Sequence, residues 1–72
     1  MTEPHPFTNA DRVKRFTDTL AAYNDEYDLD SNLIDLLADA RHWCDAHGHA
    51  FAEFDRTAYQ HYLAERREEV RP

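Results

Sequence analysis

Four residues near the middle of the chain have side chains suited to metal binding or nucleophilic chemistry: His42, Cys44, His47 and His49. Cys44 and His47 stand one helical turn apart, so a thiolate and an imidazole on one helix face could share a zinc ion. His49 could join them from the following turn, whereas His42 falls nearly opposite Cys44. A free cysteine within an apolar arc, however, behaves as a small hydrophobic residue. We therefore expect no cofactor. A metal-stabilised module using Cys44 and His47 is the alternative.

The acidic stretch before these residues matches part of a calcium-binding loop. Asp28, Asp30 and Asn32 occupy the first, third and fifth ligand positions of an EF-hand. The position that needs glycine is Leu33, and the position that needs a bidentate glutamate is Asp39. We therefore interpret the stretch as an acidic connection that caps a helix.

Catalysis by Cys44 would require a histidine base and a pocket that admits a substrate. A helical bundle of only 72 residues leaves little room for such a cleft. Carboxylates that could act as acids or bases are so numerous that they single out no active site. The sequence therefore predicts that the protein is not an enzyme.

The element that positions the cysteine and the histidines is a predicted helix over residues 32–47. Its apolar side chains cover roughly half of the circumference, against the ~100° stripe of an ordinary surface helix. They are Leu33, Leu37, Ala40 and Cys44 on one line, with Leu36, Trp43 and Ile34 beside it. Asp30, Ser31 or Asn32 should cap its start, and Gly48 should end it with a positive φ. A helix this apolar should lie between two partners.

A second helix is predicted over residues 9–24, with Thr8 as its cap, a capping box to Asp11 and Phe7 as a hydrophobic staple. Its single apolar stripe consists of Val13, Phe16, Leu20, Tyr23 and Tyr27. A third helix is predicted over residues 51–69, and its stripe consists of Phe51, Phe54, Ala58 and Tyr62, widened by Tyr59 and Leu63.

These elements predict an all-α fold, a compact three-helix bundle with the middle helix central. The short connection at residues 48–50 makes the last two helices antiparallel neighbours. One domain should span residues 8–70. Residues 1–7 should form a flexible arm, because Pro4 and Pro6 block regular structure.

The net charge of −7 is concentrated in the middle of the chain, where residues 16–55 hold ten acidic side chains and one basic side chain. Such a surface repels nucleic-acid phosphates and anionic lipids and favours a basic protein. A helix-turn-helix arrangement of the last two helices would present Glu53 and Asp55 to DNA, with only Arg56 basic. We therefore expect no direct contact with nucleic acid or membrane.

The single cysteine cannot form an internal disulfide, and no apolar run is long enough to span a bilayer. The first residues also lack the basic and apolar regions of a secretory signal. These features predict a cytoplasmic protein.

The residues expected to bind a partner lie at the edges of the apolar stripes. Trp43 and Tyr59 should remain exposed as apolar anchors, since tryptophan and tyrosine are enriched at binding hot spots. Asp35 and Asp39 should supply charges at the rim. The favoured function is therefore a small acidic protein-interaction module that binds another protein or forms a homodimer. The alternative is an anionic mimic of nucleic acid that inhibits a nucleic-acid-binding protein.

The strings DLLADARHWCDAHG and AFAEFDRTAYQHYLAE resemble a group of small uncharacterised proteins from bacterial genomes and from phages and plasmids. The shared pattern is an apolar helix ending in HWCD, a glycine turn, and a helix ending in HY-x-AE. It covers about Leu33 to Glu65. The resemblance implies a compact helical fold and an origin in a mobile element, and it implies no activity.

Overall fold

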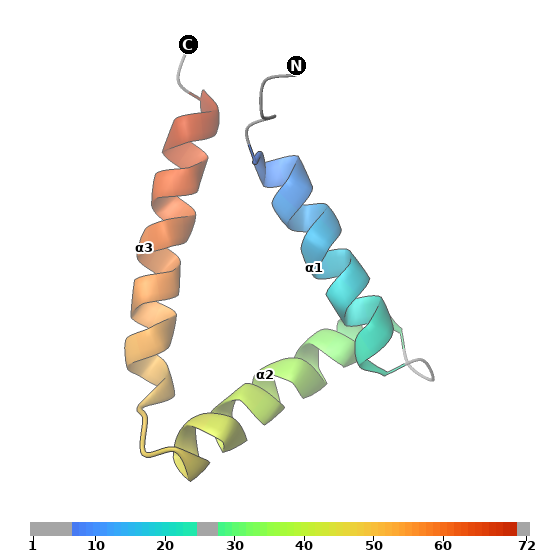
Figure 1. Ribbon diagram of the computed structural model, residues 1–72, viewed down its shortest axis with the longest axis vertical. Helices are drawn as coiled ribbons and strands as arrows, with labels where there is room; N and C mark the ends of the chain where they lie inside the picture. Colours follow the sequence, from blue (N-terminus) through green and yellow to red (C-terminus); the bar gives the residue numbers. More distant parts are fainter. Residues whose placement is uncertain (1–6, 25–27, 71–72) are drawn as a thin grey trace, which may run out of the picture.

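The computed structural model describes residues 7–24 and 28–70, which form three helices and no strand. They are α1 (Asn9–Tyr23), α2 (Leu29–Ala46) and α3 (Phe51–Val70). Figure 1 shows them as the sides of a triangle, with α2 as the base that joins α1 to α3. The predicted all-α fold of three helices that pack against one another is confirmed. Tyr27 and the predicted arm, apart from Phe7, lie outside the described residues.

The start of α1 is set by the predicted capping box. The Thr8 hydroxyl accepts a hydrogen bond from the Asp11 backbone N–H at 3.2 Å, and the Asp11 carboxylate accepts one from the Thr8 backbone N–H at 2.9 Å. Phe7 packs by cation–π contacts, because the guanidinium groups of Arg12 and Arg15 lie 5.1 and 4.7 Å from its ring centre. The helix ends at Tyr23, one residue before the predicted end.

The start of α2 lies three residues before the predicted one. Asp28 is its cap, and the Asp28 carboxylate accepts a hydrogen bond from the Ser31 backbone N–H at 2.7 Å. The prediction that Asp30, Ser31 or Asn32 would cap this helix is therefore wrong, because all three lie within it. Asn32 instead uses its side chain to contact α1 and is almost fully buried, with 1% of its surface exposed.

The turn from α2 to α3 is built around Gly48, which has the predicted positive φ, at 72°. The Gly48 N–H donates to the Asp45 carbonyl at 3.3 Å, and the His49 N–H donates to the Cys44 carbonyl at 2.8 Å. These two bonds form a Schellman motif, which ends α2 at Ala46, one residue before the predicted end. α3 then begins at Phe51 as predicted.

The helices meet near their ends and leave much of their length uncovered (Figure 1). The radius of gyration is 15.3 Å, whereas a closely packed chain of this length would have about 11 Å. Within the described residues, the only buried hydrophobic side chains are Leu20 and Cys44. The expectation that neighbours would cover half of α2 is therefore wrong, and Ile34, for example, is 67% exposed.

Candidate interaction surface

Trp43 lies in an aromatic cluster at the turn between α2 and α3. Its indole stacks on the His47 ring at 4.2 Å between centres and on the His49 ring at 6.0 Å. The His49 ring in turn lies 5.1 Å from the ring of Phe54 at the start of α3. Even so, 54% of the Trp43 surface is exposed, as expected for a residue at the edge of its stripe. The cluster therefore holds a large aromatic ring in place at the surface.

The two candidate zinc-binding histidines take part in this aromatic cluster. The His47 ring nitrogen Nδ1 lies 2.8 Å from the Trp43 carbonyl oxygen, within hydrogen-bond distance, so it is engaged with its own helix. Across residues 7–24 and 28–70, no group of three His, Cys, Asp or Glu side chains could hold a metal ion. The arrangement of Cys44, His47 and His49 thus offers no metal centre in the described part of the chain.

Cys44 is 3% exposed and lies in the C-terminal part of α2. A thiol in this position packs as a hydrophobic group, as its place on the apolar arc predicted. A nucleophile must reach its substrate, and this thiol lies beneath the surface.

Tyr59, the second predicted anchor, lies in the middle of α3 and is 58% exposed. Its ring stacks on that of Tyr62 with 6.1 Å between centres. In the described part of the chain no ring contact joins Tyr59 to Trp43, so the two anchors belong to separate patches. The sequence predicted that both residues are exposed, but it did not predict this separation.

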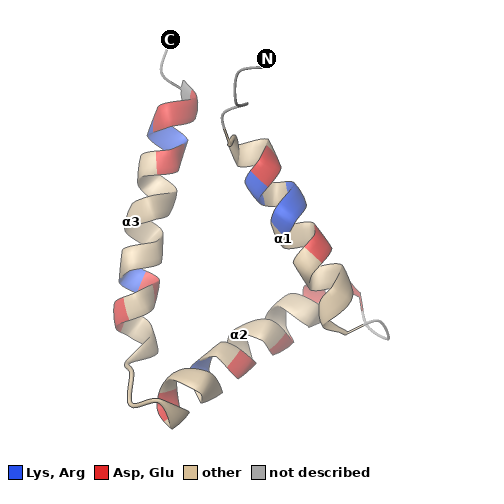
Figure 2. Ribbon diagram, in the orientation of Figure 1, with Lys and Arg blue, Asp and Glu red and all other residues tan. Residues whose placement is uncertain are grey.

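Asp35 and Asp39, the predicted rim charges, are exposed on α2. Figure 2 shows acidic residues along α2 and charges of both signs near the ends of α1 and α3. The Tyr23 hydroxyl donates a hydrogen bond to the Asp39 carboxylate, which joins the end of α1 to α2. This hydrogen bond, together with partial burial and the charges of Asp39 and Asp35, raises the pKa of Tyr23 above its ordinary value of 10.0. Asp39 is therefore also a structural residue.

A groove of about 360 Å³ lies between α1 and α3, and the sequence patterns did not predict it. The residues that line it are Asn9, Arg12, Val13, Phe16, Thr17, Tyr62 and Glu65. Val13, Phe16 and Tyr62 follow the helical spacing of the predicted apolar stripes. The structure leaves all three exposed, because α1 and α3 diverge from one another (Figure 1).

Polar contacts hold the two helices together at one end of this groove. The Arg12 guanidinium lies 3.2 Å from the Glu65 carboxylate, and the Asn9 amide donates to the Glu65 carbonyl at 3.1 Å. The backbone N–H of Asn9 donates to the Glu69 carboxylate. A carboxylate at this place is favoured by the positive end of the α1 dipole. The triangle is therefore closed where the start of α1 meets the last turns of α3.

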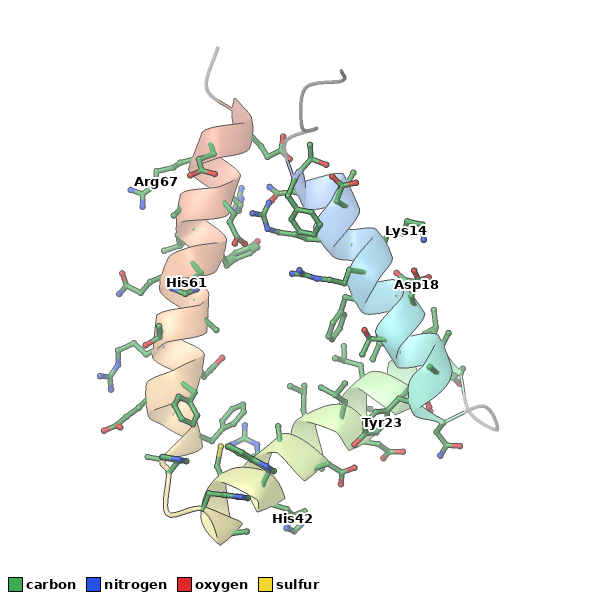
Figure 3. The ribbon with its side chains drawn as sticks, viewed as in Figure 1. Lys14, Asp18, Tyr23, His42, His61 and Arg67 are labelled. Carbon is green, nitrogen blue, oxygen red and sulfur yellow. The ribbon has the colours of Figure 1, made fainter. Side chains whose placement is uncertain are left out.

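Three charged side chains labelled in Figure 3 point away from the space between the helices. They are Lys14, Asp18 and Arg67. Lys14 and Asp18 form an exposed ion pair at 2.8 Å on α1. His42 also points away from the enclosed side, so it shares no site with Cys44.

No protein-family model matches this chain, and neither a curated protein nor a solved structure matches it. Each helix in the described residues is too short or too polar to span a lipid bilayer.

Proposed function

We propose that this chain is a small acidic protein-interaction module that binds another protein, or a second copy of itself, through apolar side chains that its own helices leave exposed. The observation that carries the proposal is the number of large hydrophobic side chains that are more than a third exposed. They are Phe7, Val13, Phe16, Tyr23, Leu29, Ile34, Leu37, Trp43, Phe54, Tyr59 and Tyr62. Single exposed hydrophobic residues are ordinary, but so many on one small domain indicate a binding surface.

Trp43 and Tyr59 are the proposed anchors of this surface. Each ring is stacked on a neighbour, so little side-chain entropy is lost when a partner covers it. Large aromatic side chains of this kind supply most of the binding energy at protein interfaces.

Asp35 and Asp39 are the proposed rim charges, and they favour a basic partner. Exposed charges of this kind mainly affect the rate of association and its dependence on salt. The anionic-mimic alternative would use the same acidic side chains, but it would not depend on Trp43 or Tyr59.

The experiment is affinity capture on immobilised chain, from a cell lysate and from a solution of the untagged chain. Trp43→Ala and Tyr59→Ala should each weaken retention of the bound protein by at least about tenfold. The matched controls are His42→Ala and His61→Ala, which truncate exposed rings on the same two helices. Circular dichroism should confirm that each variant keeps its helix content.

Replacing Asp35 and Asp39 by asparagine tests the rim. If the partner is basic, retention should fall more at low salt than at high salt, because screening already weakens these charges at high salt. Retention that is unchanged in both aromatic variants would contradict the proposal. Retention that depends only on the aspartates would favour the anionic mimic instead.

A further inference from the structure

We propose that a second copy of this chain packs against the groove between α1 and α3, so that the working unit is a homodimer. The inference rests on the proposed function for the claim that exposed apolar side chains bind protein. It goes further in naming the occupant and in placing the contact at Val13, Phe16 and Tyr62, away from Trp43.

The exposed area of the chain supports a large interface. Its accessible surface is 6474 Å², whereas a compact monomer of this mass exposes about 4,700 Å². The excess is about 1,800 Å², and a standard interface takes about 800 Å² from each partner. Covering less than half of the excess would therefore be enough for a stable dimer.

The small core also requires additional burial. Within the described residues only Leu20 and Cys44 are buried hydrophobic side chains. In chains of fewer than about 80 residues a single core rarely supplies much stability, and association is one way to add burial. A second copy is available whenever the protein is made, and a two-fold contact would cover the same surface on both chains.

The chemistry of the groove suits an apolar occupant. Val13, Phe16 and Tyr62 supply apolar surface, and the Arg12 guanidinium is paired with the Glu65 carboxylate at 3.2 Å. Since these two charges compensate one another, covering the groove leaves no unpaired charge behind. The exposed Ile34 and Leu37 of α2 are apolar side chains that a second copy could place there.

The lack of net charge in the groove also argues against a basic protein as its occupant. The acidic side chains that would attract such a partner lie along α2 (Figure 2). Two copies, each with a net charge of −7, repel one another at long range. The groove contact should therefore form in spite of this charge, and salt should strengthen it.

The first test is the mass of the purified chain by light scattering over a range of protein concentrations. The expected mass is twice the 8.5 kDa of one chain. The melting temperature should rise with protein concentration, because association stabilises the folded state by mass action.

The second test is the sign of the salt effect. Raising sodium chloride from about 0.01 M to about 0.15 M shortens the screening length from about 30 Å to about 8 Å. The dissociation constant of the dimer should fall over this range. A complex with a basic protein would weaken over the same range.

Variants then locate the contact. Val13→Glu places a charge in the groove and should give a chain of monomeric mass. Ala22→Glu adds the same charge nine residues further along α1, on about the opposite side of the helix, and should remain dimeric. If Val13→Glu fails to fold, Tyr62→Ala should raise the dissociation constant about tenfold, while His61→Ala should leave it unchanged.

A monomeric mass for the unmodified chain at every concentration would overturn the dimer. Capture of another protein that depends on Trp43 and Tyr59 would still support the proposed function in that case. A dimer that survives both Val13→Glu and Tyr62→Ala would overturn the placement at the groove. A dissociation constant that rises with salt would also contradict the proposal.

Discussion

The side-chain amide of Asn32 donates a hydrogen bond of 2.7 Å to the carbonyl oxygen of Leu20, and thereby joins α2 to the last turn of α1. The same amide nitrogen donates to the Asn24 carbonyl at 2.9 Å. Both of these carbonyls lie at the end of α1, where the helix has no backbone N–H group to donate to them. Asn32 is therefore the polar centre of the corner between α1 and α2.

Replacing Asn32 should destabilise this corner. Asn32→Ala would leave the buried carbonyl of Leu20 without its donor, and we expect a loss of about 1 to 3 kcal/mol in the free energy of unfolding. Asn32→Asp keeps the shape but replaces the donating amide by an acceptor, so it should cost at least as much. Urea unfolding followed by circular dichroism would measure both. Asp30→Ala, on the exposed side of the same helix, is the control, and equal stability of all three variants would argue against this role.

The Asp28 cap predicts an acid-sensitive start of α2. Hydrogen bonds from Ser31 lower the pKa of Asp28 below its ordinary value of 3.8, because they favour the charged carboxylate. A lowered pKa means that the carboxylate contributes stability above pH 3.8, and that this contribution is lost as pH falls through the folded-state pKa. Asp28→Ala should therefore be less stable than the unmodified chain at neutral pH, and the difference should vanish in stronger acid. Thermal melts at a series of pH values would show this, and a difference that persists at low pH would not fit.

The helix starts show which parts of this structure could be predicted from the sequence. Thr8 and Asp11 are three residues apart and both bonds of the capping box are local, so pattern alone located the start of α1. At α2 we expected the cap to be Asp30, Ser31 or Asn32, whereas Asp28 is the cap. Asn32 is instead occupied by its hydrogen bond to the carbonyl of Leu20, twelve residues earlier in the chain. No local sequence pattern indicates that contact.

The candidate surface also has a part that the sequence predicted and a part that it did not. The exposure of Trp43 and Tyr59 followed from their places at the edges of apolar stripes. The groove between α1 and α3 depends on the angle between these helices, which is set partly by contacts of Asn9 with Glu65 and Glu69, about sixty residues away in the chain. A helical wheel shows which side of a helix is apolar, but it does not show whether another helix covers that side.

Gly48 should tolerate substitution only at a cost in backbone strain. Its φ is 72°, and a Cβ atom there would meet no atom outside residues 47–49 within 4 Å. Gly48→Ala should therefore lose about 1 to 2 kcal/mol in the free energy of unfolding, from the conformation alone. Gly48→Asn should lose less, because asparagine adopts this region more readily. Unfolding curves for the two variants would measure the order, and an alanine variant as stable as the original would contradict the explanation.

The hydrogen bond from Tyr23 to Asp39 should be visible in an alkaline titration. The raised pKa of Tyr23 means that its phenol loses a proton above pH 10.0, the ordinary value. The bond therefore contributes stability below that pH and is lost as pH rises through the raised pKa. The ultraviolet absorbance of tyrosinate should lose a step above pH 10.0 in Tyr23→Phe, and Asp39→Asn should move that step to lower pH. Asp35→Asn should shift it less, since the Asp35 charge is the smallest of the four causes.

The burial of Cys44 predicts a protected thiol. With 3% of its surface exposed, Cys44 should react with a water-soluble thiol reagent only when the surrounding structure opens. The reaction should therefore be slow in native buffer and should accelerate steeply across the unfolding transition in urea. A small peptide that contains cysteine provides the rate for a free thiol. A native rate equal to that of the peptide would show that the thiol is accessible.

The contact between the Asn9 backbone and the Glu69 carboxylate has one more consequence. It brings the two ends of the helical path together, so the three helices form a ring that is nearly continuous in space. A short linker could join these ends, and new termini could be opened at the exposed turn over residues 48–50, giving a circular permutant with the same three helices in a different order.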